Sequence, residues 1–196
     1  MIPADPIERF REVYALAEKI DRSLIPDPTA MSLATIEERD RPSVRIVLLK
    51  AFDERGFVFY TNYEGRKGRH LLAHPQAGLC FYWAPLDIQV RVEGAVTKVS
   101  DEEADAYFAT RARLSQIGAW ASKQSEPLET PDALDERVRK YEKKFEGKPV
   151  PRPPFWSGFR VAPDRIEFWK GKPNRLHERH LYTKAGNGWK IETLYP

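Results

Sequence analysis

The stretch "SVRIVLLKAFDERGFVFYTN", residues 43–62, contains two runs of β-branched, aromatic and other apolar residues joined by the polar tetrapeptide "DERG". Runs of this composition bounded by turn residues are typical of β-strands. The same composition recurs on both sides of the stretch, in "AMSLATIE", "AGLCFYWA" and "DIQVRVEGAVTKVS", with short joints between the runs. The first half of the chain therefore predicts an antiparallel meander.

Helices are predicted around this meander. The segment at residues 5–22 begins with a capping-box arrangement, in which Asp5 is the N-cap, Pro6 the first helical residue and Glu8 the third. A short helix, "GRKGRHLLAH", is expected within the meander, and a helical insertion at about residues 101–146. The part of the insertion that reads "DERVRKYEKKFEGK" interleaves acids and bases, which is typical of a solvated helix face.

Strand patterns return after the proline-rich segment "GKPVPRPP", in "WSGFRVAP", "RIEFWKG", "NRLHERHLYT" and "GWKIETLY". Because so few strands would be marginal alone, we expect them to join the earlier sheet. A sheet of about eight strands favours closure into a small barrel, which removes exposed edges. The sequence thus predicts a single domain over residues 1–196, mainly β with flanking helices.

Length and composition exclude several classes of protein. The chain has 196 residues, of which 32 are basic and 29 acidic, so that its net charge is +3. This balance, with acids interrupting the basic residues, argues against nucleic-acid binding. No run approaches the roughly 20 apolar residues of a membrane span, and the N-terminus lacks the apolar centre of a secretory signal. We therefore expect a soluble, cytoplasmic protein, in which the single cysteine, Cys80, is a buried structural thiol.

Familiar catalytic and metal-binding motifs are absent from the sequence. It has no glycine-rich dinucleotide fingerprint, no phosphate loop and no nucleophile turn of a Ser-His-Asp hydrolase. The four histidines, His70, His74, His177 and His180, form no recognisable ligand set, so no metal is expected. Side chains alone therefore offer little redox or electrophilic power.

Separate groups of cations in a chain of balanced charge predict anion sites. Arg45 and Lys50 lie at opposite ends of an otherwise apolar strand, where unpaired charges are costly unless they reach a ligand or an exposed edge. Arg66 and Lys67 open the short helix, whose N-terminal amide groups favour a phosphate. A basic helix start that faces water fits this second pair equally well.

Two further groups point the same way. Tyr107, Arg111 and Ser115 recur at steps of four, so that one helix through all three would present a phenol, a guanidinium and a hydroxyl on one face. A helix end with an exposed arginine fits that spacing equally well. In "NRLHERHLY", residues 174–182, two arginines and a histidine occupy every second position and would share one face of a strand. Two bound phosphates would account for all these cations.

Seven ordered segments resemble those of the pyridoxamine 5′-phosphate oxidases: "RIVLLK", "FYTN" followed by "RK", "QVRVEG", "SQIGAWASKQS", "FWSGFRV", "IEFWKG" and "RLHER". The resemblance covers about residues 5–196 and is far more specific than any one motif. It implies an FMN-binding split β-barrel that acts as a homodimer, with two FMN molecules bound across the subunit interface. It also implies oxidation of pyridoxamine 5′-phosphate or pyridoxine 5′-phosphate to pyridoxal 5′-phosphate by O2, which gives H2O2 and, from the amine, NH3.

The resemblance also implies roles for individual residues. The FMN site would use cations, amides and an indole: Arg45, Lys50, Tyr60, Thr61, Arg66, Lys67, Gln89, Gln124, Ser125, Trp169 and Arg179. The substrate phosphate would be held by Lys50, Tyr107, Arg111 and Ser115. The catalytic pair, Arg175 and His177, would close over the substrate ring and orient its C4′ carbon, a positioning role rather than proton abstraction.

Two departures from the family pattern concern FMN affinity. Gly65 stands where a serine commonly precedes the "RK" pair, and Thr193 stands where the C-terminal ending usually has an arginine. Two alternative functions stay open, namely a related FMN-dependent oxidase of another aromatic intermediate, as in phenazine pathways, and a non-catalytic binder of FMN or pyridoxal phosphate. The substrate-phosphate residues argue against the first, and the Arg175 and His177 pair argues against the second.

Overall fold

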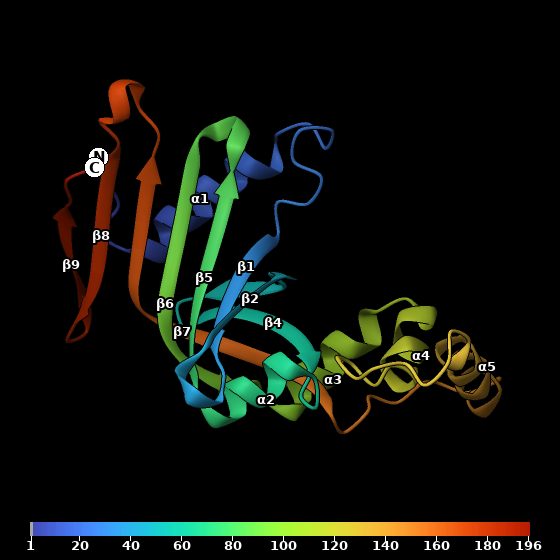
Figure 1. Ribbon diagram of the computed structural model, residues 1–196. Coiled ribbons are helices and arrows are strands. Elements are labelled where there is room, and N and C mark those ends of the chain that lie inside the picture. The colour runs from blue at the N-terminus through green and yellow to red at the C-terminus, as the bar shows by residue number, and fades with distance from the viewer. Residues whose placement is uncertain (1) are drawn as a thin grey trace.

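An antiparallel sheet of nine strands dominates the computed structural model, which describes residues 2–196 without the side chain of Glu38 (Figure 1). Its main path runs in the order β2-β1-β5-β6-β7-β4-β3, while β8 pairs with β7 and β9 with β8. The strands are β1 (Ala30–Ile36), β2 (Pro42–Leu48), β3 (Ala51–Asp53), β4 (Gly56–Asn62), β5 (Gln76–Trp83), β6 (Ile88–Lys98), β7 (Trp156–Lys170), β8 (Glu178–Ala185) and β9 (Gly188–Thr193). The prediction of a mainly β chain with flanking helices is confirmed.

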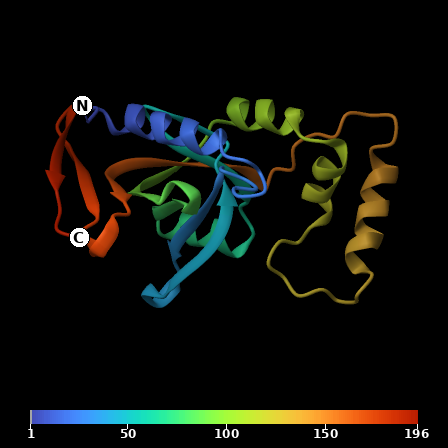
Figure 2. The same ribbon diagram turned by 90° about the horizontal axis from the view of Figure 1, so that it is seen from above.

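The helices lie beside the sheet and at one end of the molecule (Figures 1 and 2). They are α1 (Pro6–Glu18), α2 (Arg66–Ala73), α3 (Asp101–Thr110), α4 (Arg113–Ala121) and α5 (Ala133–Lys144), with short 3-10 turns η1 (Glu38–Asp40), η2 (Ala84–Leu86) and η3 (Pro173–Arg175). Helices α3 to α5 form an arm at one end, and β8, β9 and both termini lie at the other (Figures 1 and 2). Within residues 2–196, no helix combines the length and the apolar character of a membrane-spanning segment.

The sheet curls back on itself without closing fully. The Lys50 N–H donates to the Val58 carbonyl at 2.8 Å, so that the chain just after β2 meets β4 and the two ends of the strand path approach each other. Strands β8 and β9 lie outside this path. The sheet is therefore a curled half-barrel with two added strands, rather than the fully closed barrel that the number of strands favoured.

Strand β7 is longer than predicted. It spans 15 residues and joins two runs that the sequence presented as separate strands. Its register against β6 shifts between Glu93 and Gly94, and a β-bulge at this point bends the strand locally. A Cβ atom at Gly94 would lie 2.0 Å from the Ala162 carbonyl oxygen, so the close approach requires glycine. As predicted, the late strands rejoin the early sheet, through this one strand.

Aromatic packing fixes α1 to the sheet. The Asp5 side chain caps the helix by accepting the Ile7 N–H at 2.8 Å, as predicted, although α1 ends at Glu18 rather than near residue 22. Phe10 is fully buried, and its ring centroid lies 4.9, 4.8 and 5.0 Å from those of three phenylalanines on β3, β4 and β5, namely Phe52, Phe57 and Phe81. Edge contacts between buried rings add to the burial of apolar area, so this cluster anchors the helix.

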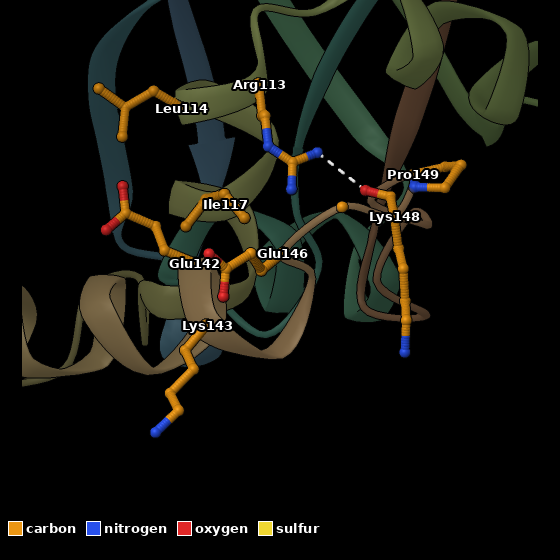
Figure 3. Close-up of a pocket in the computed structure, with 9 residues that line it drawn as sticks. Arg113, Leu114, Ile117, Glu142, Lys143, Glu146, Lys148 and Pro149 are labelled. Atoms are coloured by element: carbon orange, nitrogen blue, oxygen red, sulfur yellow. Dashed lines mark hydrogen bonds between the residues drawn. The ribbon is translucent and has the colours of Figure 1, made fainter.

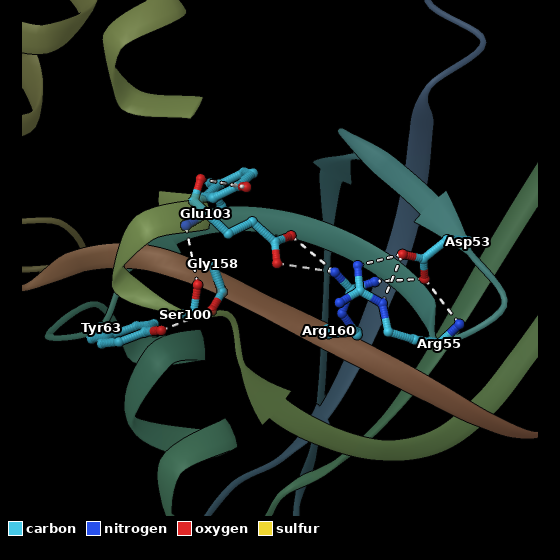
Figure 4. Close-up of polar contacts among 8 residues, drawn as sticks. Asp53, Arg55, Tyr63, Ser100, Glu103, Gly158 and Arg160 are labelled. Atoms are coloured by element: carbon cyan, nitrogen blue, oxygen red, sulfur yellow. Dashed lines mark hydrogen bonds and ion pairs between the residues drawn. The ribbon is translucent and has the colours of Figure 1, made fainter. Parts of the chain in front are cut away.

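A buried arginine ties the helical arm to the sheet (Figure 4). Arg160 on β7 donates to Asp53 on β3 at 2.8 Å and to both carboxylate oxygens of Glu103 on α3 at 2.9 and 3.1 Å. Partial burial alone would raise the pKa of Asp53, but hydrogen bonds from Arg55 and the charge of Arg160 outweigh it and lower that pKa. The Tyr60 hydroxyl also donates to the Glu103 carbonyl at 3.5 Å. This network sets where α3 lies on the sheet.

Replacing Arg160 with methionine is expected to lower the free energy of unfolding by about 3 kcal/mol, because the Glu103 carboxylate loses its partner and Asp53 keeps only Arg55. Urea unfolding measures the change. Arg165→Met is the matched control, since Arg165 is on the same strand but is half exposed and lies 3.6 Å from a single carboxylate, that of Glu93. It should cost less than about 1 kcal/mol, and equal losses in the two variants would contradict the role assigned to Arg160.

Candidate active site

The first group of predicted site residues surrounds the start of α2. We name it the Arg45 cluster; its members are Arg45, Thr61, Arg66, Lys67, Gln124 and Ser125. Lys67 Nζ donates to Thr61 Oγ1 at 3.2 Å and to Gln124 Oε1 at 2.8 Å. The Arg66 backbone N–H donates to Ser125 Oγ at 3.3 Å. Strand β4, helix α2 and the segment after α4 thus meet at one point, so the structure places these predicted residues together.

Two cations in the Arg45 cluster have neutral partners. Arg45 donates to the Leu33 carbonyl at 3.0 Å and to the hydroxyls of Thr35 and Ser43 at 2.7 Å each. Among the residues that the structure describes, no carboxylate contacts Arg45 or Lys67. Burial lowers the pKa of both side chains, and the charge of Arg45 further lowers that of Lys67. Partly desolvated cations that lack a carboxylate partner indicate an anion site.

Other members of the cluster differ from this pair. The Arg66 guanidinium lies 2.7 Å from the Glu37 carboxylate and is more than half exposed, so its charge is already balanced. Gly65 is the N-cap of α2 and provides no side-chain cap. A Cβ atom at Gly65 would lie 2.5 Å from Gln124 Oε1. A serine at this position would therefore displace the carboxamide oxygen that accepts from Lys67.

The second group is an aromatic stack around a half-buried guanidinium. We name it the Tyr107 stack; its members are Tyr60, Tyr107, Arg111 and Trp156. The Tyr60 and Tyr107 rings are nearly parallel with centroids 4.0 Å apart, and Trp156 stacks on the Tyr60 ring at 5.5 Å. The guanidinium carbon of Arg111 lies 4.5 Å from the Trp156 centroid. Among the described residues, Arg111 Nη1 is buried without a hydrogen-bond partner, so this donor indicates where a ligand oxygen binds.

The stack holds its phenols in the neutral form. Burial raises the pKa of Tyr60 to about 12, and the nearby Glu103 carboxylate adds to the increase. Burial also raises the pKa of Tyr107, although the charge of Arg111 opposes this. Both phenols are therefore protonated at neutral pH, and Arg111 is the cation of the stack.

A single helix that would present Tyr107, Arg111 and Ser115 on one face does not form. The chain breaks between α3 and α4, where Arg111 has extended backbone angles of φ −73° and ψ 146°. The break places the Arg111 guanidinium against Trp156 and leaves Ser115 exposed on α4. Tyr107 and Arg111 are thus neighbours in the Tyr107 stack, while Ser115 is outside it.

Lys50 is exposed just beyond β2. Its backbone is bonded to Val58, two residues from Tyr60 on β4. Lys50 lines a cavity of about 490 Å³, together with Tyr14, Thr29, Leu49, Ala51 and Phe52. The structure therefore places Lys50 beside the strand that carries Tyr60, with the side chain free to reach solvent.

A larger cavity of about 1040 Å³ lies between α4 and the end of α5 (Figure 3). The Arg113 guanidinium closes one side of it by donating to the Lys148 carbonyl at 2.9 Å. Its lining contains none of the predicted site residues: Arg113, Leu114, Ile117, Glu142, Lys143, Glu146, Gly147, Lys148 and Pro149. Cavity size therefore does not identify the predicted site.

The third group of predicted residues spans three neighbouring strands, and we name it the Trp169 cluster: Gln89, Trp169, His177 and Arg179. Gln89 on β6 pairs with Trp169 on β7, which pairs with Arg179 on β8. The His177 ring centroid lies 4.6 Å from that of Trp169. His177 Nδ1 accepts the Lys172 backbone N–H at 3.2 Å, so the neutral ring carries its proton on Nε2.

The prediction that Arg175, His177 and Arg179 share one strand face is wrong. Strand β8 begins at Glu178, so that only Arg179 lies in a strand. Arg175 is in the turn η3, where it and its neighbour Asn174 both have a positive φ, of 62° and 57° respectively. Arg175 is exposed on this turn, next to the Trp169 cluster in sequence.

A buried carboxylate orients Arg179. Glu167 on β7 is 4% exposed and accepts from Arg179 Nε at 2.8 Å, from Arg179 Nη2 at 3.1 Å and from Arg91 Nη2. Burial alone would raise the pKa of Glu167, but the hydrogen bonds from Arg179 and Arg91 outweigh it and lower that pKa. Arg179 Nη1 also donates to the Tyr195 carbonyl at 2.9 Å. The C-terminal segment thus helps to fix Arg179.

The lowered pKa of Glu167 predicts an acid-sensitive contribution to stability. A carboxyl whose pKa is lower in the folded state than its ordinary 4.5 contributes fully above about pH 4.5 and loses that contribution as the pH falls through the folded value. Glu167→Gln should therefore lower the free energy of unfolding at pH 7 by about 3 kcal/mol, and by less at pH 3.5.

Urea unfolding at the two pH values measures this difference. Glu192→Gln is the control, because Glu192 lies half exposed on β9 in an ion pair with Lys190. A Glu167→Gln deficit that is the same at both pH values would contradict the assignment.

The Arg45 cluster and the Trp169 cluster lie near opposite ends of β7 (Figure 1). Thr61 pairs with Ser157, which is 12 residues before Trp169 on the same strand. At about 3.3 Å per residue this is about 40 Å of strand. The two clusters therefore lie at separate parts of the sheet, far apart along β7.

Some residues of the site were not singled out by the sequence. Thr35 lies beneath Arg45, Trp156 lies against Arg111, and Glu167 holds Arg179. Thr35 and Glu167 each occur as a polar residue within an apolar strand run, "AMSLATIE" and "RIEFWKG". Such a residue must find a partner when the strand is buried, and this was the available signal.

Comparison with known proteins identifies the family. Residues 17–145 match the sequence model described as "Pyridoxamine 5'-phosphate oxidase", and residues 156–196 match "Pyridoxine 5'-phosphate oxidase C-terminal dimerisation region". The "Pyridoxine/pyridoxamine 5'-phosphate oxidase" of Myxococcus xanthus (strain DK1622) is 59% identical over 196 residues, which is 100% of this chain and 94% of that protein. The protein of the same name from Rubrobacter xylanophilus is 56% identical over 192 residues, 98% of this chain and 87% of that protein.

Solved structures agree on the fold. PhzG from Burkholderia lata 383, in complex with tetrahydrophenazine-1-carboxylic acid, matches with a TM-score of 0.90 and 31% identity, over 99% of this chain and 94% of that one. A pyridoxamine 5′-phosphate oxidase-related, FMN-binding protein from Nostoc punctiforme PCC 73102 matches with a TM-score of 0.75 and 20% identity over 100% of both chains, a likeness that shows the split-barrel fold. On these family matches, this chain belongs to the pyridoxamine 5′-phosphate oxidase family.

Proposed function

We propose that the chain is an FMN-dependent oxidase that converts pyridoxamine 5′-phosphate or pyridoxine 5′-phosphate to pyridoxal 5′-phosphate. O2 is the acceptor, H2O2 is released, and the amine substrate also gives NH3. The observation that carries this proposal is that partly buried cations in two separate places, Arg45 with Lys67 and Arg111, contact no carboxylate among the described residues. The cofactor and the substrate each carry one phosphate, and relatives at 59% and 56% identity bear the name of this activity.

The Arg45 cluster fits the phosphate of FMN. It combines a guanidinium and an ammonium without carboxylate partners among the described residues, a hydroxyl from Ser125 and the N–H groups that open α2. In the proposal Arg45, Lys67 and Ser125 hold the phosphate, and Thr61 and Gln124 border the flavin. Bound FMN supplies the two-electron chemistry that side chains lack.

The Tyr107 stack fits the substrate phosphate. Arg111 Nη1 is a buried donor in need of an acceptor, and the neutral phenol of Tyr107 can add a second hydrogen bond. Lys50 and Ser115 are proposed to complete the set from exposed positions. Binding the phosphate at one end of a flat ring, with Arg175 and His177 over the other, fixes the orientation of the reacting carbon. His177 offers its Nε2–H as a donor in this arrangement.

We also propose a homodimer in which each FMN site combines the Arg45 cluster of one chain with the Trp169 cluster of a second copy. The separation of the two clusters along β7 supports this arrangement. Strand β2 presents an apolar row to solvent, in which Val44 is 65%, Ile46 64% and Leu48 37% exposed. An exposed apolar strand face marks an interface. Residues 156–196 match a region described as a dimerisation region.

A second candidate is an oxidase of another aromatic intermediate, of the phenazine type. The likeness to PhzG favours it. The buried Arg111 donor needs an anionic acceptor, which would be the phosphate of a B6 substrate in the first candidate and a carboxylate in a phenazine-type acid. The two candidates therefore differ in what Arg111 binds.

Matched substrates test the proposal. FMN-loaded protein is supplied with pyridoxamine 5′-phosphate, pyridoxine 5′-phosphate or unphosphorylated pyridoxamine, and H2O2 and the aldehyde product are measured. We expect rapid turnover of both phosphorylated compounds and much slower turnover of pyridoxamine. Turnover of a reduced phenazine precursor alone would favour the second candidate, and FMN binding without turnover of any donor would indicate a non-catalytic binder.

A further inference from the structure

A buried hydroxyl and a buried imidazole lie behind the Arg45 cluster. Thr35 on β1 is 2% exposed and His70 on α2 is 8% exposed. Thr35 Oγ1 lies 2.7 Å from Arg45 Nη1 and 3.0 Å from His70 Nδ1. A continuous chain of hydrogen bonds therefore links β2, β1 and α2 and ends on the guanidinium.

The direction of these hydrogen bonds follows from the chemistry of the groups. Arg45 can only donate, so the Thr35 oxygen accepts its N–H. With the His70 proton on Nε2, Nδ1 accepts the single Thr35 proton at 3.0 Å, a shorter contact than the 3.5 Å from Thr35 Oγ1 to the Ser43 carbonyl. Burial and the charge of Arg45 lower the pKa of His70, so the ring is neutral at pH 7 and Nδ1 is free to accept.

The contacts of Arg45 fix its guanidinium but do not use all of its N–H donors. Nη1 uses its two N–H groups on the Leu33 carbonyl and on Thr35, and Nη2 uses one N–H on Ser43. In the contacts of the described residues, Nε–H and the second Nη2–H are left for a ligand. A long side chain that is held in advance loses less conformational entropy when its ligand binds.

We propose that Thr35 and His70 are positioning residues for the cofactor phosphate. They hold the Arg45 guanidinium in its binding orientation and touch neither cofactor nor substrate. This inference rests on the proposed function, because it takes FMN as the ligand of the Arg45 cluster. It differs from a purely structural role in one measurable respect: the effect must depend on the phosphate of the flavin.

Riboflavin, which is the same flavin without the phosphate, provides the matched ligand. Kd values for FMN and riboflavin are measured by fluorescence titration of the full-length protein after its flavin is removed. Thr35→Val, which removes the hydroxyl at constant shape, is expected to raise the FMN Kd about tenfold and the riboflavin Kd less than about twofold. Thr35→Ser keeps the hydroxyl and should bring the FMN Kd back to within about threefold of the parent value.

Variants of His70 test the other end of the hydrogen-bond chain from His70 through Thr35 to Arg45. They test the proposed positioning role even if Thr35→Val does not fold. His70→Phe keeps the flat ring but removes the acceptor, and it should raise the FMN Kd by about fivefold while leaving the riboflavin Kd unchanged. His70→Asn places a carboxamide oxygen near the position of Nδ1 and should restore most of the affinity. Thermal unfolding of each variant shows that the comparison is made on folded protein.

Three results would overturn the inference. The first is an equal loss of affinity for FMN and riboflavin in the Thr35 and His70 variants, which would mean that these hydrogen bonds only support the fold. The second is an unchanged FMN Kd in Thr35→Val and His70→Phe. The third is a parent protein that does not bind FMN, in which case the proposed function fails as well. If the parent binds FMN and the variants match it, the inference fails alone.

Discussion

Replacing Arg111 with methionine is expected to lower kcat/KM for pyridoxamine 5′-phosphate about a thousandfold. Methionine keeps an unbranched chain against Trp156 but removes the buried Nη1 donor and its charge. Losing a desolvated, charged hydrogen bond to a phosphate costs about 4 kcal/mol, and each 1.4 kcal/mol is a factor of about ten. Steady-state H2O2 production at saturating FMN, over a range of substrate concentrations, gives the value.

The control for this prediction is Arg113→Met. Arg113 is two residues away, and its guanidinium donates to the backbone carbonyls of Lys148 and Phe145, outside the Tyr107 stack. Its kcat/KM should change by less than about threefold. Turnover of unphosphorylated pyridoxamine, however slow, should be the same in Arg111→Met and in the parent. A parallel loss with both substrates would mean that Arg111 supports the stack and does not bind the phosphate.

Two inactive variants are expected to recover about a quarter of the parent activity when they form mixed dimers. Lys67→Met disables the Arg45 cluster, and the double change Arg175→Ala with His177→Ala disables the side next to the Trp169 cluster. If each site combines one side from each chain, a mixed dimer has one site with every change and one site with none. Random pairing makes about half of all dimers mixed, so about a quarter of all sites are intact.

Co-expression of the two variants with different tags, followed by an activity assay, measures this recovery. The matched control pairs Lys67→Met with Arg45→Met, which alter the same cluster and leave no intact site in any dimer. Recovery in the first pair alone supports the shared site. No recovery in either pair would mean that each chain builds a complete site by itself, and the proposed arrangement would be wrong.

Most strands could be predicted because their composition is distinctive, but strand β7 could not be predicted as one element. Pro163 lies at its centre, and a proline within a strand pattern normally indicates a break. A bulge accommodates it, because Asp164 on β7 is left without a partner between Glu93 and Gly94 of β6, and this depends on how the two strands pair. The helix break at Arg111 could not be predicted either, because no glycine or proline marks it in the sequence. The stacking of Arg111 on Trp156 is a tertiary contact, which the local sequence does not show. Cys80, expected to be buried, is half-buried on β5.

The sequence allowed the candidate site residues to be proposed as a set, but their arrangement could not be predicted from it. The ordered motifs named the residues, and the structure divides them into an Arg45 cluster, a Tyr107 stack and a Trp169 cluster. That division depends on the length of β7 and on the curl of the sheet. Thr35 and His70 could not be assigned, because a threonine in a strand and a histidine on a helix acquire meaning only when Arg45 is placed beside them. Gly65 likewise gains its meaning from the position of Gln124.

The most direct test of the proposed oxidase is an absorption spectrum of the FMN-loaded protein under anaerobic conditions. Pyridoxamine 5′-phosphate or pyridoxine 5′-phosphate is added, and air is then admitted. We expect the flavin band to bleach on addition of either compound and to return on aeration, with formation of H2O2 and pyridoxal 5′-phosphate. A protein that holds FMN but whose flavin band is left unchanged by both compounds would contradict the account.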